Sequence, residues 1–120
     1  MNIVSKFPKN LKPQFKAKLR FHFREKQHKE QRQWFLFQED GHRRVPMEMN
    51  GVEGLNTVGM WTEDSQVFQS GEETIVDCIV LWEEAYRDAV RVGVKFELWD
   101  GGFFAEGEVV HRYEEGWSCE

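Results

Sequence analysis

Gly54 and Gly59 have the spacing of the two glycines in a phosphate-binding loop, but the residues that follow them do not suit that chemistry. In such a loop a Lys and then a Ser or Thr follow the second glycine, because the lysine contacts the phosphates and the hydroxyl contacts Mg²⁺. Here Met60 and Trp61 follow instead. A dinucleotide-binding glycine motif is also missing from the sequence. We therefore expect neither nucleotide hydrolysis nor a bound nucleotide.

The side chains that could bind a metal ion or act as acid and base are scattered along the chain. Paired spacing of the kind used by structural zinc sites is not found among His22, His28, His42, His111, Cys78 and Cys119. The carboxylates that occur in pairs are sequence neighbours, which splay apart instead of converging in a dry cleft: Glu72 and Glu73, Glu83 and Glu84, and Glu114 and Glu115. No nucleophile motif is present. The sequence predicts a protein that is not an enzyme and that holds no cofactor or metal; a deep pocket with convergent polar groups would indicate otherwise.

Basic side chains alternate with apolar ones near the N-terminus. From residue 15 to residue 23 every second residue is apolar, and the positions between and after them carry Lys16, Lys18, Arg20, His22 and Arg24. This period of two predicts a half-buried strand, whose basic side chains lie about 6.6–7 Å apart on one face. Such a face, joined by Arg43 and Arg44, could form an electrostatic track for RNA. The alternative is an exposed barrel face that pairs with acidic strands, which the acidic pI of 5.4 favours.

A glycine-rich turn near the C-terminus suggests a surface for a protein partner. The sequence Asp100-Gly101-Gly102 predicts a tight hairpin turn between strands at 94–99 and 103–112. Trp99 falls on the outward face of its strand, whereas Trp82 is expected in the core. Exposed aromatic residues commonly anchor interfaces. Our hypothesis is that the partner-binding surface consists of Trp99, Asp100, Gly101, Gly102 and Phe104.

The elements that position these residues are predicted to form one all-β domain. A chain of 120 residues with 40% hydrophobic and 14% aromatic content can bury a core of its own. Further strands are expected at 45–49, with Pro46 at an edge or a bulge, at the segment ending in Trp61, and at 74–82, a run covered on both faces for part of its length. Residues 83–89 are expected to form a single helical turn, and the polar residues 25–33 a loop. We expect an irregular arm at 1–13, a barrel or sandwich at 14–113 and a tail at 114–120.

Charge is unevenly distributed along the chain. Residues 1–45 carry 12 basic and 4 acidic side chains, while residues 46–120 carry 4 and 17, which gives the net charge of −5. The two segments either attract each other across a sheet or leave one basic face for an anion. The sequence shows no membrane-spanning apolar run and no secretory signal in residues 1–10, so we expect a cytoplasmic protein without a membrane partner. Both cysteines are expected to be free thiols.

Several short motifs resemble the C-terminal β-barrel domain of translation elongation factor Tu. Residues 95–110, KFELWDGGFFAEGEVV, are similar to that domain's last hairpin, with its acid-Gly-Gly turn and paired valines. Ser70-Gly71-Glu72 is similar to the Pro-Gly-Asp before the family's long strand, Arg91-Val92-Gly93 also fits, and Gly41 to Pro46 is a weaker match. Phe103 stands where the family usually carries Arg. The resemblance spans residues 15–112 and implies a six-stranded antiparallel Greek-key barrel without the accompanying GTPase.

The resemblance also implies a mode of action. In the full factor this domain contacts tRNA and the exchange factor, through surfaces that Gly101, Gly102, Arg43 and Arg44 match in part. We therefore predict a non-catalytic binding module with a protein partner, acting as a translation-factor-like adaptor or as an inhibitor of the antitoxin or immunity type. The alternative is an RNA-binding accessory factor that uses the basic strand.

Overall fold

The structure is a computed structural model, which describes residues 11–23, 34–63 and 66–118. Nearly all of its regular structure is β-strand. The strands are β1 (Phe15–Phe21), β2 (Phe35–Leu36), β3 (His42–Met49), β4 (Asn56–Thr62), β5 (Val67–Phe68), β6 (Glu73–Val80), β7 (Lys95–Trp99) and β8 (Phe103–Arg112). The helix α1 (Glu83–Tyr86) and the 3₁₀ helix η2 (Glu114–Gly116) are each about one turn long. The predicted loop at 25–33 lies outside the described residues.

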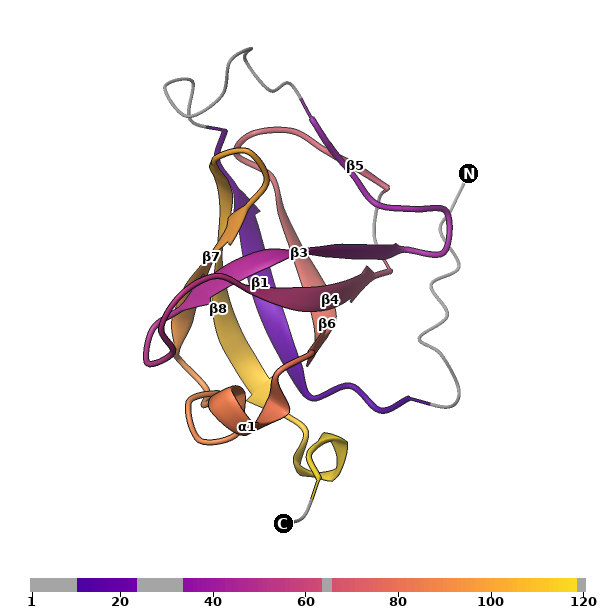
Figure 1. Ribbon diagram of the computed structural model, residues 1–120. Coiled ribbons are helices and arrows are strands. Elements are labelled where there is room, and N and C mark those ends of the chain that lie inside the picture. The colour runs from indigo at the N-terminus through magenta and orange to yellow at the C-terminus, as the bar shows by residue number, and fades with distance from the viewer. Residues whose placement is uncertain (1–10, 24–33, 64–65, 119–120) are drawn as a thin grey trace.

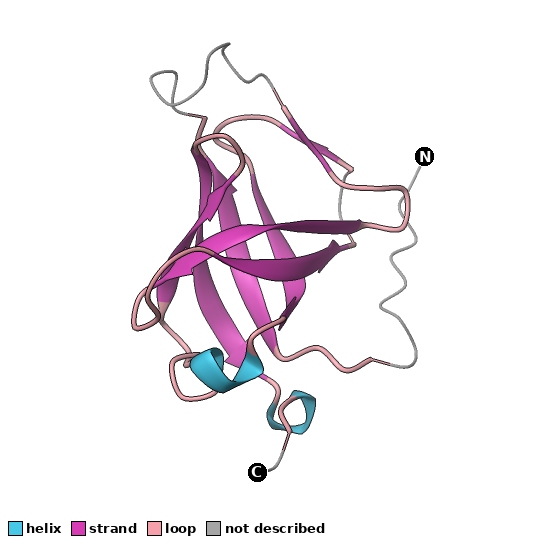
Figure 2. Ribbon diagram, in the orientation of Figure 1, coloured by secondary structure: helices cyan, strands magenta, loops and turns pink. Residues whose placement is uncertain are grey.

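Six of the strands form a closed antiparallel barrel. Their order around it is β1-β6-β4-β3-β7-β8, and pairing between β8 and β1 closes it. Three strands in succession, β3, β4 and β6, are neighbours, and β1 lies beside the last of them, which is the Greek-key arrangement. The predicted fold class is therefore confirmed. Figure 1 shows the short β2–β5 pair at one end of the barrel and α1 at the other, and Figure 2 shows that the two helical turns both lie at that second end, which we call the base.

Alternation along β1 supplies much of the core, as the sequence predicted. Phe15, Ala17, Leu19 and Phe21 are fully buried, while the residues between them face outward. At the end away from the base, the rings of Phe21 and Phe68 stack with their centroids 4.8 Å apart, so β5 closes that opening with aromatic side chains. The Cys78 thiol is buried in this core, and burial raises its pKa well above the ordinary value. Cys119 lies outside the described residues.

One glycine in β8 makes room for an aromatic ring. Phe96 and Gly107 face each other across the β7–β8 pairing. A Cβ atom at residue 107 would lie 2.1 Å from the Phe96 ring, well inside van der Waals contact. The ring thus occupies the space that any other side chain would need, which explains the glycine.

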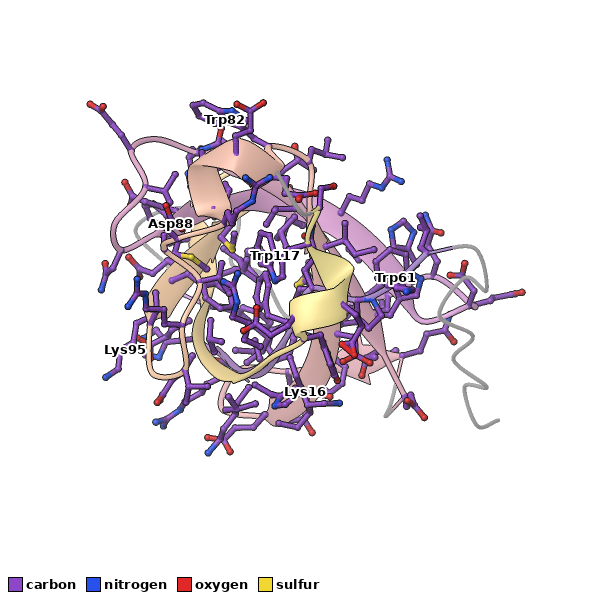
Figure 3. The ribbon with its side chains drawn as sticks, turned by 90° about the horizontal axis from the view of Figure 1, so that it is seen from below. Lys16, Trp61, Trp82, Asp88, Lys95 and Trp117 are labelled. Carbon is purple, nitrogen blue, oxygen red and sulfur yellow. The ribbon has the colours of Figure 1, made fainter. Side chains whose placement is uncertain are left out.

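The base is closed by residues from both ends of the barrel sequence. Gln14 donates its backbone N–H to the Cys78 carbonyl over 2.9 Å, and its side-chain Oε1 accepts the Val80 N–H over 2.7 Å. The Gln14 carbonyl in turn accepts the Tyr113 N–H over 3.0 Å and the Trp117 Nε1–H over 3.2 Å. Seen from below in Figure 3, Trp117 lies near the middle of the base, and it is buried although it belongs to the predicted tail.

Two expectations for the segment 74–82 are wrong. β6 buries only alternate residues, and Ile75 is 41% exposed, so this strand is not covered on both faces there. Trp82 is not a core residue, because β6 ends at Val80 and the chain then turns into α1. Pro46 does lie at an edge: β7 pairs only with residues 47–49 of β3, so Pro46 is beyond the stretch that has strands on both sides.

Candidate functional site

The predicted turn between β7 and β8 is formed and held by an arginine. The Asp100 N–H donates to the Gly102 carbonyl over 2.9 Å, and Gly101 has a φ of +74°, which a glycine adopts without strain. The Arg43 Nη2 lies 3.5 Å from the Asp100 carboxylate, and its Nη1 donates to the Leu36 carbonyl over 2.8 Å. The turn is thereby fixed to β2.

The predicted apolar surface at this turn is only partly present. Trp99 faces outward and is 36% exposed, in agreement with its parity, but Phe104 is fully buried. The reason is a bulge: Leu98 pairs with Ala105 and Trp99 pairs with Phe103, which leaves Phe104 as the extra residue. Its ring turns inward and stacks on Phe35 with centroids 4.5 Å apart. Phe104 therefore cannot contact a partner, and the expectation that it joins Trp99 at the surface is wrong.

Two basic side chains of β1 are paired with carboxylates of β6. The Lys16 Nζ lies 3.3 Å from Asp77, and the Lys18 Nζ lies 3.4 Å from Glu73. Arg20 lies opposite Glu73 in the strand register. Lys16 and Lys18 thus show the cross-strand pairing of opposite charges that the sequence offered as one alternative.

On its other side, β1 borders more carboxylates. Lys18 lies opposite Glu108 of β8, and Arg20 lies opposite Glu106. The basic strand therefore runs between acidic strands and does not form a uniformly positive face. Phosphate groups bind best where positive charge is concentrated, so this mixed face is a poor fit for RNA.

The other predicted RNA-binding residues do not extend this face. Arg43 and Arg44 belong to β3, which is three strands away from β1 in either direction around the barrel. The expectation that they continue the basic track of β1 is wrong, because sequence proximity does not determine strand order. Arg44 is exposed on that far side, and Arg24 lies outside the described residues.

A cluster of titratable groups beside β1 has the electrostatics of a structural contact. The Tyr113 hydroxyl donates to Asp77 over 2.8 Å, and Lys16 pairs with the same carboxylate. Burial raises the pKa of Tyr113, and the bond to Asp77 raises it further. Burial opposes the charge on Lys16, but Asp77 and Tyr113 outweigh this effect and raise its pKa. Both groups keep their protons near neutral pH, whereas a general base must be deprotonated in order to accept a proton.

Leu81 and Trp82 are two large apolar side chains that are exposed at the base. They are 68% and 54% exposed, and they connect the end of β6 to α1. Trp82 lies at the rim of the base in Figure 3, well away from the buried Trp117. Leu81 also lines an open groove of about 440 Å³, together with Leu11 and Trp117.

The groove continues past α1 and has an acidic border. A second depression of about 480 Å³ shares Glu83 and Ser118 with the first and adds Glu84. Glu83 accepts the Ser118 backbone N–H and pairs with Arg87, and the bond from Ser118 is the main reason that its pKa is lowered. We call the exposed pair Leu81 and Trp82 and these two depressions together the basal surface.

The described residues contain no group of three His, Cys, Asp or Glu side chains that could hold a metal ion. Within the same residues, no helix has the length and apolar character needed to cross a membrane. In sequence comparisons, no known protein family and no curated protein matches the chain.

Sequence reasoning missed the basal surface for two different reasons. The exposure of Leu81 could have been predicted, since Val76, Cys78 and Val80 point inward and the next residue must then point outward. The exposure of Trp82 could not, because alternation would place Trp82 in the core if the strand continued. The strand ends at Val80.

Proposed function

We propose that this chain is a non-catalytic β-barrel module that binds a protein partner through the basal surface. The observation that carries the proposal is the exposure of Leu81 and Trp82, two large apolar side chains that are neighbours in the sequence, together with the groove that Leu81 lines. Apolar surface of this kind is favourable to bury, and a tryptophan is among the residues that contribute most to interfaces. The barrel beneath supplies a rigid support, which limits the entropy lost on binding.

The finer form of the proposal follows the resemblance to the elongation factor Tu barrel. The closed six-stranded barrel agrees with the fold that the resemblance implies, and this supports kinship with that domain. The chain would then bind its partner as an adaptor of the translation-factor type or as an inhibitor of the antitoxin or immunity type. The β7–β8 turn is a second contact surface with less support, since Phe104 is buried and Asp100 is paired with Arg43.

RNA binding by β1 is the alternative function, and the carboxylates on both sides of that strand weigh against it. Both functions can be compared in one experiment. The chain is used to capture partners from a lysate of its source cells, and the eluate is examined for protein and for RNA after washing in high salt. RNA bound by phosphate contacts is lost in high salt, because counterion release drives such binding.

The deciding variants are Trp82→Ala and Trp34→Ala. Trp34 is 49% exposed and lies at the β2 end of the barrel, so it is a matched control for Trp82. We expect a stoichiometric protein that is captured by the wild type and by Trp34→Ala but is lost with Trp82→Ala. Equal capture by both variants would assign the partner to another surface, and enriched RNA with no protein would replace the proposal by its alternative.

A further inference from the structure

We infer that the segment bound at the basal surface is a basic and apolar one, in which arginine or lysine side chains accompany leucine-like side chains. This inference rests on the proposed function and adds the chemistry of the partner. It follows from three properties of the same surface: an apolar wall, unpaired carboxylates at the border and an exposed indole ring.

The apolar wall consists of side chains that no described residue covers fully. Leu81 and Leu11 line the first depression and are both exposed, and Ile79 of β6 also lines it. The depression is open and shallow, which suits the side chains of a polypeptide segment better than an enclosed small molecule. Leucine-like side chains can therefore be buried against this wall.

The border of the groove has an excess of negative charge. Glu84 and Glu115 make no ion pair with any of the residues that the structure describes, and both line the depressions. Glu83 and Arg87 form an ion pair with a nitrogen–oxygen distance of 3.3 Å, so together they add no net charge to the border. Among the described residues that line the two depressions, Lys12 is the one positive charge left to oppose these two carboxylates. A segment that carries Arg or Lys would neutralise this border, whereas an acidic segment would be repelled.

Trp82 strengthens the preference for a cation. Its exposed ring lies two residues from Glu84 in the sequence, at the entrance to α1. An arginine side chain favours the face of an indole ring. The exposed indole therefore adds a preference for a planar cation, which aliphatic surface alone would not provide.

The test uses two short synthetic peptides of equal length, one that alternates arginine with leucine and one that alternates glutamate with leucine. Binding to the full chain is measured by isothermal titration and mapped by amide chemical shifts. We expect the arginine peptide to bind, with shifts at 81–84 and 115–118, and the glutamate peptide to bind at least about tenfold more weakly.

Charge-reversal variants identify the carboxylates responsible. Glu84→Lys combined with Glu115→Lys is expected to lower the affinity for the arginine peptide about tenfold. Glu39→Lys combined with Glu48→Lys changes the net charge equally at exposed positions elsewhere and is expected to leave the affinity almost unchanged. Trp82→Ala is expected to cost on the order of thirtyfold.

The inference would be overturned by equal binding of both peptides, by no binding of the arginine peptide, or by equal losses with the two double variants. Residues 1–10 contain Lys6 and Lys9 among apolar residues, so a chain that begins at Leu11 is measured in parallel. Binding seen only in that shorter chain would assign the groove to the N-terminal segment and would also overturn the inference. A captured cellular partner that depends on Trp82 but is insensitive to the double reversal would refute this inference while supporting the proposed function.

Discussion

Glu83 shows how a single side chain can join separate parts of the base. It lies at the first position of α1, accepts the Ser118 N–H and pairs with Arg87 one turn later. The bond from Ser118 and then the contact with Arg87 favour the ionised carboxylate, so they lower the pKa of Glu83 below its ordinary value of 4.5.

The lowered pKa predicts how stability depends on pH. A carboxyl group whose pKa is lower in the folded state stabilises that state fully above the unfolded value, and this stabilisation is lost as the pH falls through the folded pKa. We expect Glu83→Gln to unfold more easily than the wild type near neutral pH, with the two free energies of unfolding converging in acid. Urea denaturation at a series of pH values measures this difference. A gap between the two proteins that stays constant down to strongly acidic pH would contradict the assignment.

The pairing of β7 with β8 depends on a ring and a glycine that fit together. Phe96 is buried, and its ring fills the volume above Gly107. Because this ring also meets Phe15 of β1 edge to face, with centroids 6.3 Å apart, the contact links three strands. Neither residue can change in size without a shift of the other.

We therefore expect Gly107→Ala to destabilise the barrel by about 1–3 kcal/mol, the usual cost of overpacking a core. Thermal and urea unfolding measure the loss. The control is a double-mutant cycle: in a Phe96→Ala background the added methyl group meets no ring, so Gly107→Ala should cost far less there. Additive losses would show that the strain comes from elsewhere in the strand.

The sequence predicted those elements whose pattern is local. Strict alternation located β1, and the acid-Gly-Gly turn located the β7–β8 hairpin, because period two and turn chemistry act over a few residues. Phe104 and Trp82 were misplaced for one shared reason, since a bulge or an early strand end changes the parity of every residue beyond it. The small β2–β5 sheet escaped notice because two-residue strands have no period to detect.

The position of Arg43 illustrates the limit at longer range. Its charge was visible in the sequence, but its contacts with Leu36 and Asp100 depend on which strands become neighbours. The sequence predicted the candidate site only in part: Trp99 is exposed as expected, but the basal surface was not predicted. The contacts of Arg43 depend on strand order, which is set by interactions between distant segments.

At the scale of the whole molecule, Gln14 connects the segments that precede and follow the barrel strands in the sequence. Its side-chain oxygen accepts the Val80 N–H, as the carbonyl of a neighbouring strand would. Its backbone carbonyl accepts hydrogen bonds from Tyr113 and Trp117. Gly116 packs so closely on this segment that a Cβ atom there would lie 2.1 Å from the Pro13 carbonyl oxygen. The segment before β1 and the segment after β8 are therefore parts of one closure.

We expect Gln14→Ala to leave the buried Val80 N–H without an acceptor and to cost about 1–3 kcal/mol. Hydrogen exchange at the Val80 amide should become faster than in the wild type, and urea denaturation should show the lost stability. Gln38→Ala is the control, because the Gln38 side chain is exposed and, among the described residues, only its backbone is bonded. Unchanged protection at Val80 would mean that another group accepts this hydrogen bond.

The pairing of β1 with β8 has a consequence for how the protein is made. A ribosome releases β1 first and β8 last of the strands, yet each is a partner that the other needs to complete the barrel. Strand pairing between distant segments also slows folding, because the loop must close before the contacts can repay its entropy. Until β8 has been synthesised, the half-apolar strand β1 therefore lacks this partner and is exposed to other nascent chains and to chaperones. Closure of this barrel is an event that follows translation of its final strand.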